Sequence, residues 1–575
     1  MWINSLFTRR THAGLILPPS PESESRLRPA LLAALLTVAI AAPLAVAQER
    51  LPDIGSSAGE LLTPAKQAEY GGMMLRELRN YGYLLEDPLI DSWLTGMGRR
   101  LAADSDKPVQ TFTFFMMGDR QINAFATLGG YIGVNAGLVL AAEREDEVAG
   151  VLSHEIAHVT QQHVLRGAER AQKDSVPILL GMLAAIVAAQ AAGGNSSGDA
   201  AMAALASAQG LIAQRQIDYT RSNESEADRV GMRTLARAGY DVDAMGDFFE
   251  RLQTATRSSR GSGREAYPDY LQTHPVTTTR ISEARQRAEQ MRRDGLASIS
   301  STVTTPSGSV TERVRQGPDY VGDSRPAANP LLPGALRPTV SSTIRIDANQ
   351  FAWARERLRV LSANTPAAAV REYEQIRRGS AKGLDDAQRY GLAVAKLRNN
   401  QLAEAASDLN ELLATHPGSL WVGLALAQVD ARAGRIAAAN QRFDALLRAN
   451  PGSRAVSIAY AQALNEQGGR EAGQRALAML RPLLGGTGED PVFQQVYARA
   501  NELAGDSVRA GEAYAETAFL NGRPEQALIQ LQNLKQRDDL DYYARSRIDA
   551  RIATITPQVL ELRRQGINDP DVERR

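Results

Sequence analysis

The sequence predicts a mainly α-helical protein in which an α+β domain with a small β-sheet is followed by an all-α repeat solenoid. Alanine is abundant and aromatic residues make up only 5% of the 575 residues, which favours helices. Strand-forming runs lie between residues 111 and 134, and small residues recur at a fixed period after residue 346. A chain of this length exceeds one hydrophobic core, so we expect at least two domains.

The charge balance and the missing cysteines exclude several classes of function. Lys and Arg total 65, Asp and Glu also total 65, and no long basic run occurs, so nucleic acid is not expected as a partner. The sequence contains no cysteine. Thiol catalysis, disulfides, cysteine-ligated zinc and a lipid-modified N-terminal cysteine are therefore excluded.

The N-terminal region has the organisation of a secretory signal peptide. Arg26 and Arg28 precede an uncharged apolar run over residues 30–47, which ends in the small-x-small sequence Ala-Val-Ala. We therefore predict a signal peptide over residues 1–47 that is cleaved near Ala47. The alternative is an uncleaved membrane anchor, against which the proline inside the apolar run and the Ala-Val-Ala ending both argue.

The first elements of the mature chain are expected to be a helix and a small sheet. Residues 63–100 have a helical pattern, whereas residues 111–117 (TFTFFMM) are rich in aromatic and β-forming residues and predict a strand. Residues 122–134 (INAFATLGGYIGV) predict two short strands joined at Gly129 and Gly130, since paired glycines favour a hairpin turn.

Two well-marked helices follow, with an apolar region between them. Apolar residues recur at helical spacing over residues 142–165, which predicts one long helix. Residues 221–240 predict a second helix, with a capping box from Asn223 to Glu226 and a stop at Gly239.

The apolar region consists of two runs, residues 176–192 and 200–213. The first would span only about 26 Å as a helix, short of the roughly 30 Å core of a bilayer. We expect a helical hairpin over residues 176–213 that packs on the protein or lies at a membrane surface, rather than a transmembrane pair.

The C-terminal part is predicted to be a helical repeat domain. Residues 296–345 are rich in Ser, Thr, Pro and Gly, a composition typical of linkers. From residue 346 onward small residues and prolines recur 34 positions apart, the period of tetratricopeptide repeats, although the phase slips after Gly485. A generic alanine-rich helical bundle is the alternative. The recurring positions are Pro417 and Pro451, Ala405 and Ala439, Gly434 and Gly468, and Ala393, Ala427 and Ala461.

The sequence SHEIAH places two histidines four residues apart on one predicted helix. His154 and His158 lie on the same helical face and can present two imidazoles to one metal ion. Glu155 is rotated by about 100° and can reach a metal-bound water instead of the metal. The alternative is a pair of structural histidines whose ring nitrogens are satisfied by other protein groups.

A catalytic zinc site needs a third protein ligand. His163 is the nearest candidate, but on a continuing helix it would point away from the metal, about 140° from His158. Downstream carboxylates are the alternative, and the sequence NESEAD offers Glu224, Glu226 and Asp228. Spacing alone does not separate the two glutamates. Asp228 lies on the same helical face as Glu224 and can hydrogen-bond a ligating histidine.

The sequence HEIAH, followed some 70 residues later by a helix with NESEAD, resembles the M48 metallopeptidases. The resemblance implies a zincin-type α+β metallopeptidase domain over residues 48–295, a linker over 296–345 and tetratricopeptide repeats over 346–575. It also implies one Zn²⁺ per chain held by His154, His158 and Glu224, with Glu155 as the catalytic base. Asp228 is then an orienting residue and Glu226 a non-ligand.

The resemblance to members of this family that have C-terminal repeats implies a periplasmic protein that takes part in quality control of outer-membrane β-barrel proteins. Unfolded or misassembled outer-membrane proteins are then the expected substrates, and the outer-membrane assembly machinery the expected partner of the repeats. The strand region 122–134 is implied to receive substrate as an added strand. The competing hypothesis is a periplasmic holdase or assembly adaptor in which zinc is structural.

His274, in the sequence THPVTTTR, is a further candidate for a residue near the metal. In the resembling proteases a His-Pro at this place can approach the metal, and an Arg follows it at the same distance along the sequence as Arg280 does here. His274 is expected either to occupy the open coordination position or to stabilise the tetrahedral oxyanion. The alternative is a loop histidine without a role.

Overall fold

The fold is described from a computed structural model of the chain, which defines residues 62–170, 219–260, 274–295, 299–305, 308–314, 343–347 and 350–564. The predicted signal peptide and the predicted apolar hairpin lie outside the described residues. No helix in the described ranges combines the length and the apolar character needed to cross a membrane.

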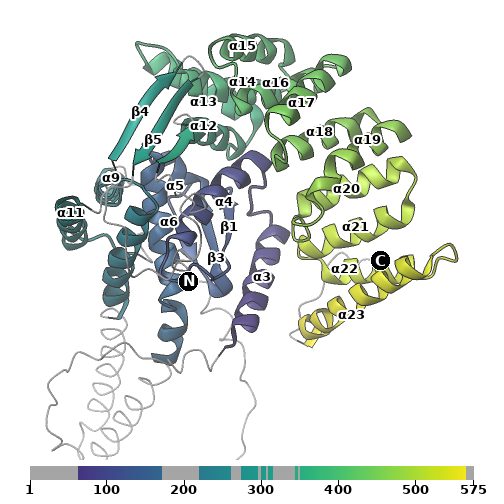
Figure 1. Ribbon diagram of the computed structural model, residues 1–575, viewed down its shortest axis with the longest axis horizontal. Coiled ribbons are helices and arrows are strands. Elements are labelled where there is room, and N and C mark those ends of the chain that lie inside the picture. The colour runs from purple at the N-terminus through teal and green to yellow at the C-terminus, as the bar shows by residue number, and fades with distance from the viewer. Residues whose placement is uncertain are drawn as a thin grey trace, which may run out of the picture. The chain divides into compact units, whose positions relative to one another are not determined.

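The region with a helical pattern, residues 63–100, consists of two helices, α3 (Pro64–Asn80) and α4 (Pro88–Ala103) (Figure 1). The chain leaves α3 at Tyr81, and Gly82 has a φ of 71°, which a helix cannot accommodate. Asp87 then caps α4, where its side chain accepts hydrogen bonds from two backbone amides and precedes the N1 proline.

A small sheet with strand order β1-β3-β2 lies beside these helices. Strand β1 (Thr113–Met117) pairs in parallel with β3 (Tyr131–Asn135), and β2 (Ala124–Ala126) pairs antiparallel with β3 on the other side. The turn between β2 and β3 is the 3-10 segment η2 (Leu128–Gly130), where Gly129 and Gly130 have φ of 74° and 82°. The predicted strand and hairpin are therefore confirmed, and β2 is an edge strand.

Helix α6 (Glu145–Thr160), which carries His154 and His158, lies at the centre of the N-terminal core. It packs on α4, β2 and α9 (Ala244–Arg260), and it follows the short helix α5 (Ala136–Ala141). Its apolar side chains Val148, Leu152 and Ile156 are fully buried. Residues 163–170 and 219–237 are also helical, and α11 (Thr278–Arg293) packs against α9.

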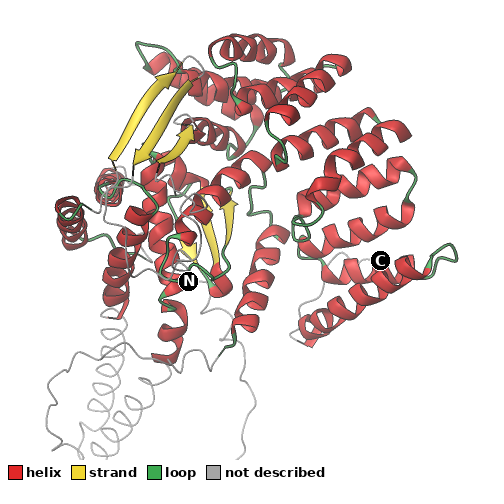
Figure 2. Ribbon diagram, viewed as in Figure 1, coloured by secondary structure: helices red, strands yellow, loops and turns green. Residues whose placement is uncertain are grey.

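The region whose composition suggested a linker contains a second sheet (Figure 2). Strands β4 (Ile299–Thr305), β5 (Gly308–Val314) and β6 (Thr343–Asp347) pair antiparallel in sequence order. The Ser/Thr content suggested a linker, but threonine and valine are β-branched and fit a pleated strand well. The linker interpretation of residues 296–345 overlooked these strands.

The C-terminal part is built from successive antiparallel helix pairs, as the 34-residue period predicts (Figure 1). The alanines of that period are fully buried, which is where small residues let paired helices approach closely. The predicted phase slip coincides with η4 (Arg481–Leu483) and a longer connection. The helices are α12 (Gln350–Leu361), α13 (Pro366–Gly379), α14 (Asp386–Arg398), α15 (Leu402–Thr415), α16 (Leu420–Arg432), α17 (Ile436–Ala449), α18 (Arg454–Gln467), α19 (Arg470–Leu480), α20 (Pro491–Ala504), α21 (Ser507–Leu520), α22 (Pro524–Lys535) and α23 (Tyr542–Arg564).

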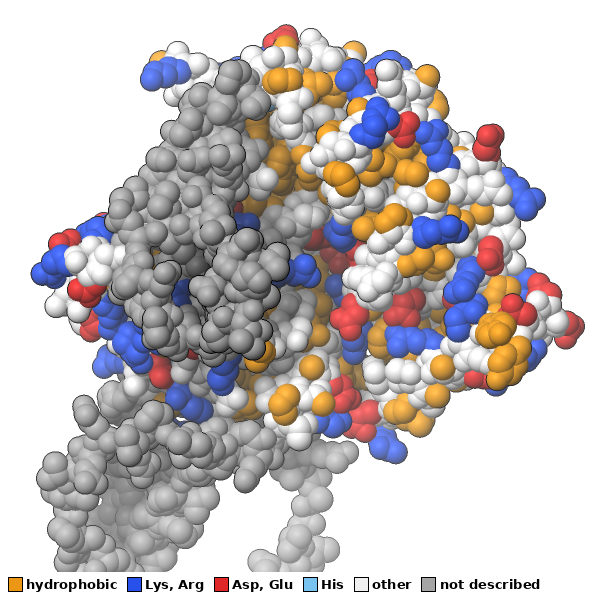
Figure 3. Space-filling model, viewed as in Figure 1, with side chains coloured by type: hydrophobic (Ala, Val, Ile, Leu, Met, Phe, Trp, Pro, Cys, Tyr) orange, Lys and Arg blue, Asp and Glu red, His pale blue; other side chains and the backbone are white. Residues whose placement is uncertain are grey.

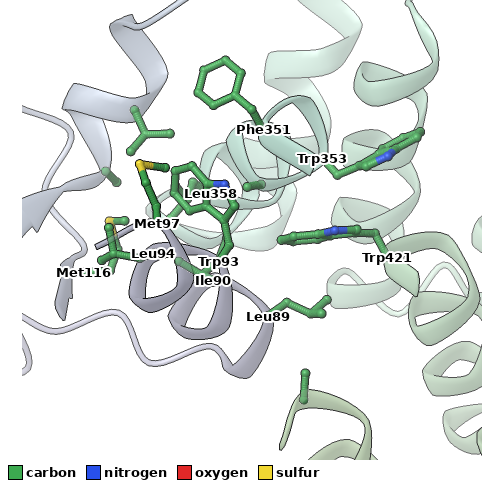
Figure 4. Packing of buried hydrophobic residues seen from close by; sticks show 14 of the residues in the cluster. Leu89, Ile90, Trp93, Leu94, Met97, Met116, Phe351, Trp353, Leu358 and Trp421 are labelled. Carbon is green, nitrogen blue, oxygen red and sulfur yellow. The ribbon is translucent and has the colours of Figure 1, made fainter. Parts of the chain in front are cut away.

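The first repeat helix, α12, shares a hydrophobic core with α4 (Figure 4). The rings of Trp93 and Phe351 lie 6.4 Å apart across this junction. Beside them the buried Arg357 of α12 donates two hydrogen bonds, of 2.8 and 2.6 Å, to the carboxylate of Asp87, the residue that caps α4. An ion pair and aromatic packing thus join the first repeat helix, α12, to α4 and its N-terminal cap.

Candidate metal centre

Four side chains from three segments converge on one point beneath the small sheet. His154 and His158 come from α6, Glu224 from helix 219–237, and His274 from the turn before α11; one ligand atom from each lies within 4.8 Å of the others. Nε2 of His154 is 3.0 Å from Nε2 of His158 and 3.4 Å from a Glu224 oxygen. His154, Glu224 and His274 are buried and the His158 side chain is only 11% exposed, as is usual for a metal centre and costly for charges without one.

A glycine allows the two helices of the site to come this close. Gly231 faces α6, and a Cβ added there would lie 3.0 Å from the Cα and N atoms of His154. Helix 219–237 runs through Asn223, so the predicted capping box is wrong and Asn223 is an interior helical residue. Its predicted end is confirmed, because Gly239 follows the last turn with a φ of 81°.

A series of buried charged side chains lies next to Nδ1 of His154, the ring nitrogen that faces away from the candidate ligands. Nδ1 of His154 lies 2.9 Å from Asp228, whose two oxygens each accept a 2.8 Å hydrogen bond from Arg280. Arg280 also lies 2.8 Å from the Glu224 oxygen that faces His154 and donates to the carbonyl of Pro275, so it ties the His274 turn to the candidate ligands. The structure thus brings both downstream candidates, Asp228 and Arg280, into contact with the ligand set.

Glu155 lies beside the ligands without being one of them. Its carboxylate is fully buried, and Nε2 of His274 lies 3.7 Å from one of its oxygens. Burial raises the pKa of Glu155, while His274 and His154 oppose that shift. A buried carboxyl group whose pKa is raised toward neutral is suited to accept and release a proton.

The remaining charges of the site are strongly coupled. Burial would lower the pKa of His154, but hydrogen bonds to Asp228 and Glu224 raise it to about 10. Burial lowers the pKa of His158 to about 3, against the hydrogen bond to Glu224 and in the same direction as the neighbouring His154 and His274. Burial would raise the pKa of Glu224, yet the three surrounding histidines hold it well below its usual range. Glu224 is therefore an anion, as a carboxylate that binds a metal should be.

The sequence interpretation missed the role of His163. Helix α6 ends at Thr160, and Gln162 adopts a φ of 56°, so the chain turns before helix 163–170 begins. His163 therefore points back at His158, and their Nδ1 atoms lie 2.9 Å apart. Its Nε2 lies 3.0 Å from Glu226, which also accepts a 2.6 Å hydrogen bond from Arg166. Glu226 is thus occupied elsewhere and lies outside the metal group.

The fold and the site together define a metallopeptidase-type centre: two histidines at i and i+4, a glutamate from a second helix, and an unligated glutamate next to the first histidine. The comparisons with known proteins agree. Residues 88–288 match the family model of peptidase family M48, and residues 396–463 match a tetratricopeptide repeat model.

Several curated proteins are similar to this chain. A putative beta-barrel assembly-enhancing protease of Vibrio cholerae is 42% identical over 264 residues, which cover 44% of this chain and 52% of that protein. The chain thus spans about half the length of the first relatives it matches. A beta-barrel assembly-enhancing protease of Yersinia pestis is 30% identical over 506 residues, 88% of this chain and 91% of that one. A mitochondrial metalloendopeptidase OMA1 of Arabidopsis thaliana is 30% identical over 154 residues, 27% of each chain.

On this similarity the chain belongs to peptidase family M48, and it also carries a region that matches a tetratricopeptide repeat. The predicted fold class and family are confirmed.

Proposed function

We propose that the protein is a zinc-dependent endopeptidase of the periplasm. It degrades misfolded or misassembled proteins in outer-membrane protein quality control, and it has chaperone-like activity. The observation that carries the proposal is the position of Glu155, a fully buried carboxylate directly next to a converging set of candidate metal-ligand atoms.

The spacing of the ligand atoms fits zinc. Zinc binds histidine nitrogen and carboxylate oxygen at about 2.0–2.1 Å in a tetrahedron, so neighbouring ligand atoms should lie about 3.3 Å apart. Nε2 of His154 lies 3.0 Å from His158, 3.4 Å from Glu224 and 3.4 Å from Nδ1 of His274. A set of nitrogen and carboxylate donors without a thiolate also suits zinc better than calcium or magnesium.

His154, His158 and Glu224 would hold the ion. When bound there, zinc would polarise the scissile carbonyl and acidify a water molecule. Glu155 then takes the proton of the attacking water and returns it to the leaving amine. Asp228, held by Arg280, lies 2.9 Å from Nδ1 of His154 and would keep that ring turned toward the ion.

His274 is proposed as a fourth ligand that closes the site at rest. Its Nδ1 lies 3.0 and 3.1 Å from the two oxygens of Glu224, within the spacing of the other ligand atoms. A closed set of four protein ligands is also what a structural zinc site has, and this observation favours the second candidate function, a holdase or assembly adaptor. The buried Glu155, which a structural site does not need, favours the peptidase.

The family and the N-terminal sequence support the proposed location and partners of the protein. A periplasmic protease whose relatives are named for β-barrel assembly would act on unfolded or misassembled outer-membrane proteins. The edge strand β2 packs against α6, and among the described residues no strand pairs with its outer side, so an extended substrate could add there as a strand. The repeats would bind the outer-membrane assembly machinery, and residues 176–213 would make a peripheral membrane contact.

The substrate class can be tested with one outer-membrane β-barrel protein in two states. The purified mature chain should cleave the urea-unfolded protein in dilute buffer and spare the same protein folded in detergent micelles. A holdase would instead keep the unfolded protein from aggregating without producing fragments. Suppression of aggregation in the complete absence of cleavage, with zinc bound, would favour the second candidate over the peptidase.

A further inference from the structure

The hydrogen bond between His158 and His163 restricts how each ring is protonated. Their Nδ1 atoms lie 2.9 Å apart, so one must carry a proton and the other must accept it. Nε2 of His158 faces His154 and Glu224, where the metal-ligand atoms converge. A ligating Nε2 has no proton, so the neutral His158 ring carries its proton on Nδ1 and donates it to His163.

The same reasoning continues one residue further. His163 accepts at Nδ1, and its proton is therefore on Nε2, which lies 3.0 Å from an oxygen of Glu226. That oxygen also accepts a hydrogen bond from Arg166. His163 is only 4% exposed, so bulk water has little access to take over either of its hydrogen bonds. Each hydrogen bond in the series His158, His163, Glu226 and Arg166 then has one donor and one acceptor.

We propose that His163 is a positioning residue of the metal centre, which accepts the Nδ1–H of His158 and relays this hydrogen bond to Glu226, so that His158 is held as an Nε2 ligand. The inference rests on the proposed zinc centre. The two histidines of α6 thus have different supports: His154 contacts a carboxylate, whereas His158 is held through a second imidazole.

The backbone conformation of the turn after α6 makes this contact between His163 and His158 possible. On a continuing helix His163 would face away from His158, about 140° around the axis. The left-handed Gln162, with a φ of 56°, breaks the helix and reverses the direction of the next side chain. Left-handed backbone is unfavourable for a residue other than glycine, and such conformations cluster at functional sites.

The test is zinc affinity, measured in the full mature chain by competition with a chelator of known affinity. Loss of a group that supports a metal ligand typically weakens metal binding by about 10–100-fold, and His163→Ala should fall in this range. His163→Asn, whose side-chain oxygen can accept from His158, should restore most of the affinity. His416→Ala is the matched control, because His416 also contacts a carboxylate, Asp386, but lies in the repeats; it should bind zinc as the wild type does.

An affinity of His163→Ala within twofold of the wild type would overturn the inference while leaving the proposed zinc site intact. A wild type that binds no zinc would instead overturn the proposed function, and this inference with it. If His163→Ala does not fold, the zinc-loaded wild type answers the question by ¹⁵N-histidine NMR. Our inference requires the neutral His163 ring to carry its proton on Nε2, and a proton on Nδ1 would refute it.

Discussion

Arg280→Met is the substitution that tests the electrostatic balance of the site most severely. The Arg280 guanidinium donates two 2.8 Å hydrogen bonds to Asp228 and lies 2.8 Å from Glu224. Methionine keeps the length and the apolar contacts of the side chain but removes the positive charge. Two buried carboxylates would then face each other with only His154 and its neighbours to compensate them.

The expected cost follows from the burial of the pair. Arg280 and Asp228 side chains are 8% and 1% exposed, and removal of one partner from a buried ion pair costs about 3–5 kcal/mol. The matched control is Arg287→Met on the same helix. Arg287 pairs with Glu283 at the surface, with side chains 24% and 38% exposed, so its loss should cost less than about 1 kcal/mol.

The pH dependence provides a second signature. Burial would raise the pKa of Asp228, but Arg280 and His154 lower it to about 2. A carboxyl group with a depressed folded-state pKa contributes stability that is present above its unfolded-state pKa and lost as pH falls through the folded value. The difference in stability between wild type and Arg280→Met should therefore be full above pH 4 and shrink toward pH 2.

The assay is urea unfolding of the zinc-free chain, followed by circular dichroism, for the wild type and both variants. Zinc-free protein is needed because a bound cation would partly replace the charge of Arg280 at Glu224. A loss of less than about 1 kcal/mol in Arg280→Met, equal to that of Arg287→Met, would refute the claim that this arginine neutralises the site.

Three further predictions concern the metal and the fit of the helices around it. Zinc should displace the proton of His154, whose pKa is about 10, so zinc affinity should fall as pH decreases. Calorimetry at pH 8 in buffers of different ionisation enthalpy should find about one proton released per zinc bound. Release of no proton would contradict this assignment. Gly231→Ala should force helix 219–237 away from His154, cost about 1–3 kcal/mol and weaken zinc binding, whereas Gly379→Ala, which meets no atom within 4 Å, should do neither. His274→Ala should cleave an unfolded protein faster than the wild type, and an unchanged rate would count against its role as a fourth ligand.

The candidate metal-binding residues of α6 could be predicted because their spacing along the sequence is local. His154 and His158 share a helical face whatever surrounds them, and the pattern of the downstream helix resembles a known ligand helix. The resemblance assigned Glu224 over Glu226, and the structure gives the physical difference. Glu226 lies against His163 and Arg166, while Glu224 lies against the ligand histidines.

The remaining features depend on tertiary contacts or on local backbone conformation that spacing does not encode. The helix that would have turned His163 away ends because Gln162 adopts a left-handed conformation, which no glycine or proline announces. The break between α3 and α4 was overlooked although Gly82 marks it. The second sheet was hidden by a Ser/Thr-rich composition, because such composition is common to linkers and to exposed strands.

The exposed surface of the repeats carries little sequence-level information about a partner. Figure 3 shows Lys and Arg interspersed with Asp and Glu on the visible face of the described residues, as the balanced composition predicts. The assignment of outer-membrane proteins and their assembly machinery as partners therefore depends on the family and not on a surface feature.

The most direct test of the central claim is the rate at which the mature chain cleaves an unfolded outer-membrane protein, compared with Glu155→Gln, with the zinc content of both proteins measured. Loss of a general base typically costs about 10²–10⁴-fold in rate. We predict one zinc per chain in both proteins and cleavage only by the wild type within the limits of the assay. Equal cleavage by Glu155→Gln at equal zinc content would contradict the assignment of Glu155 as the base of a zinc peptidase.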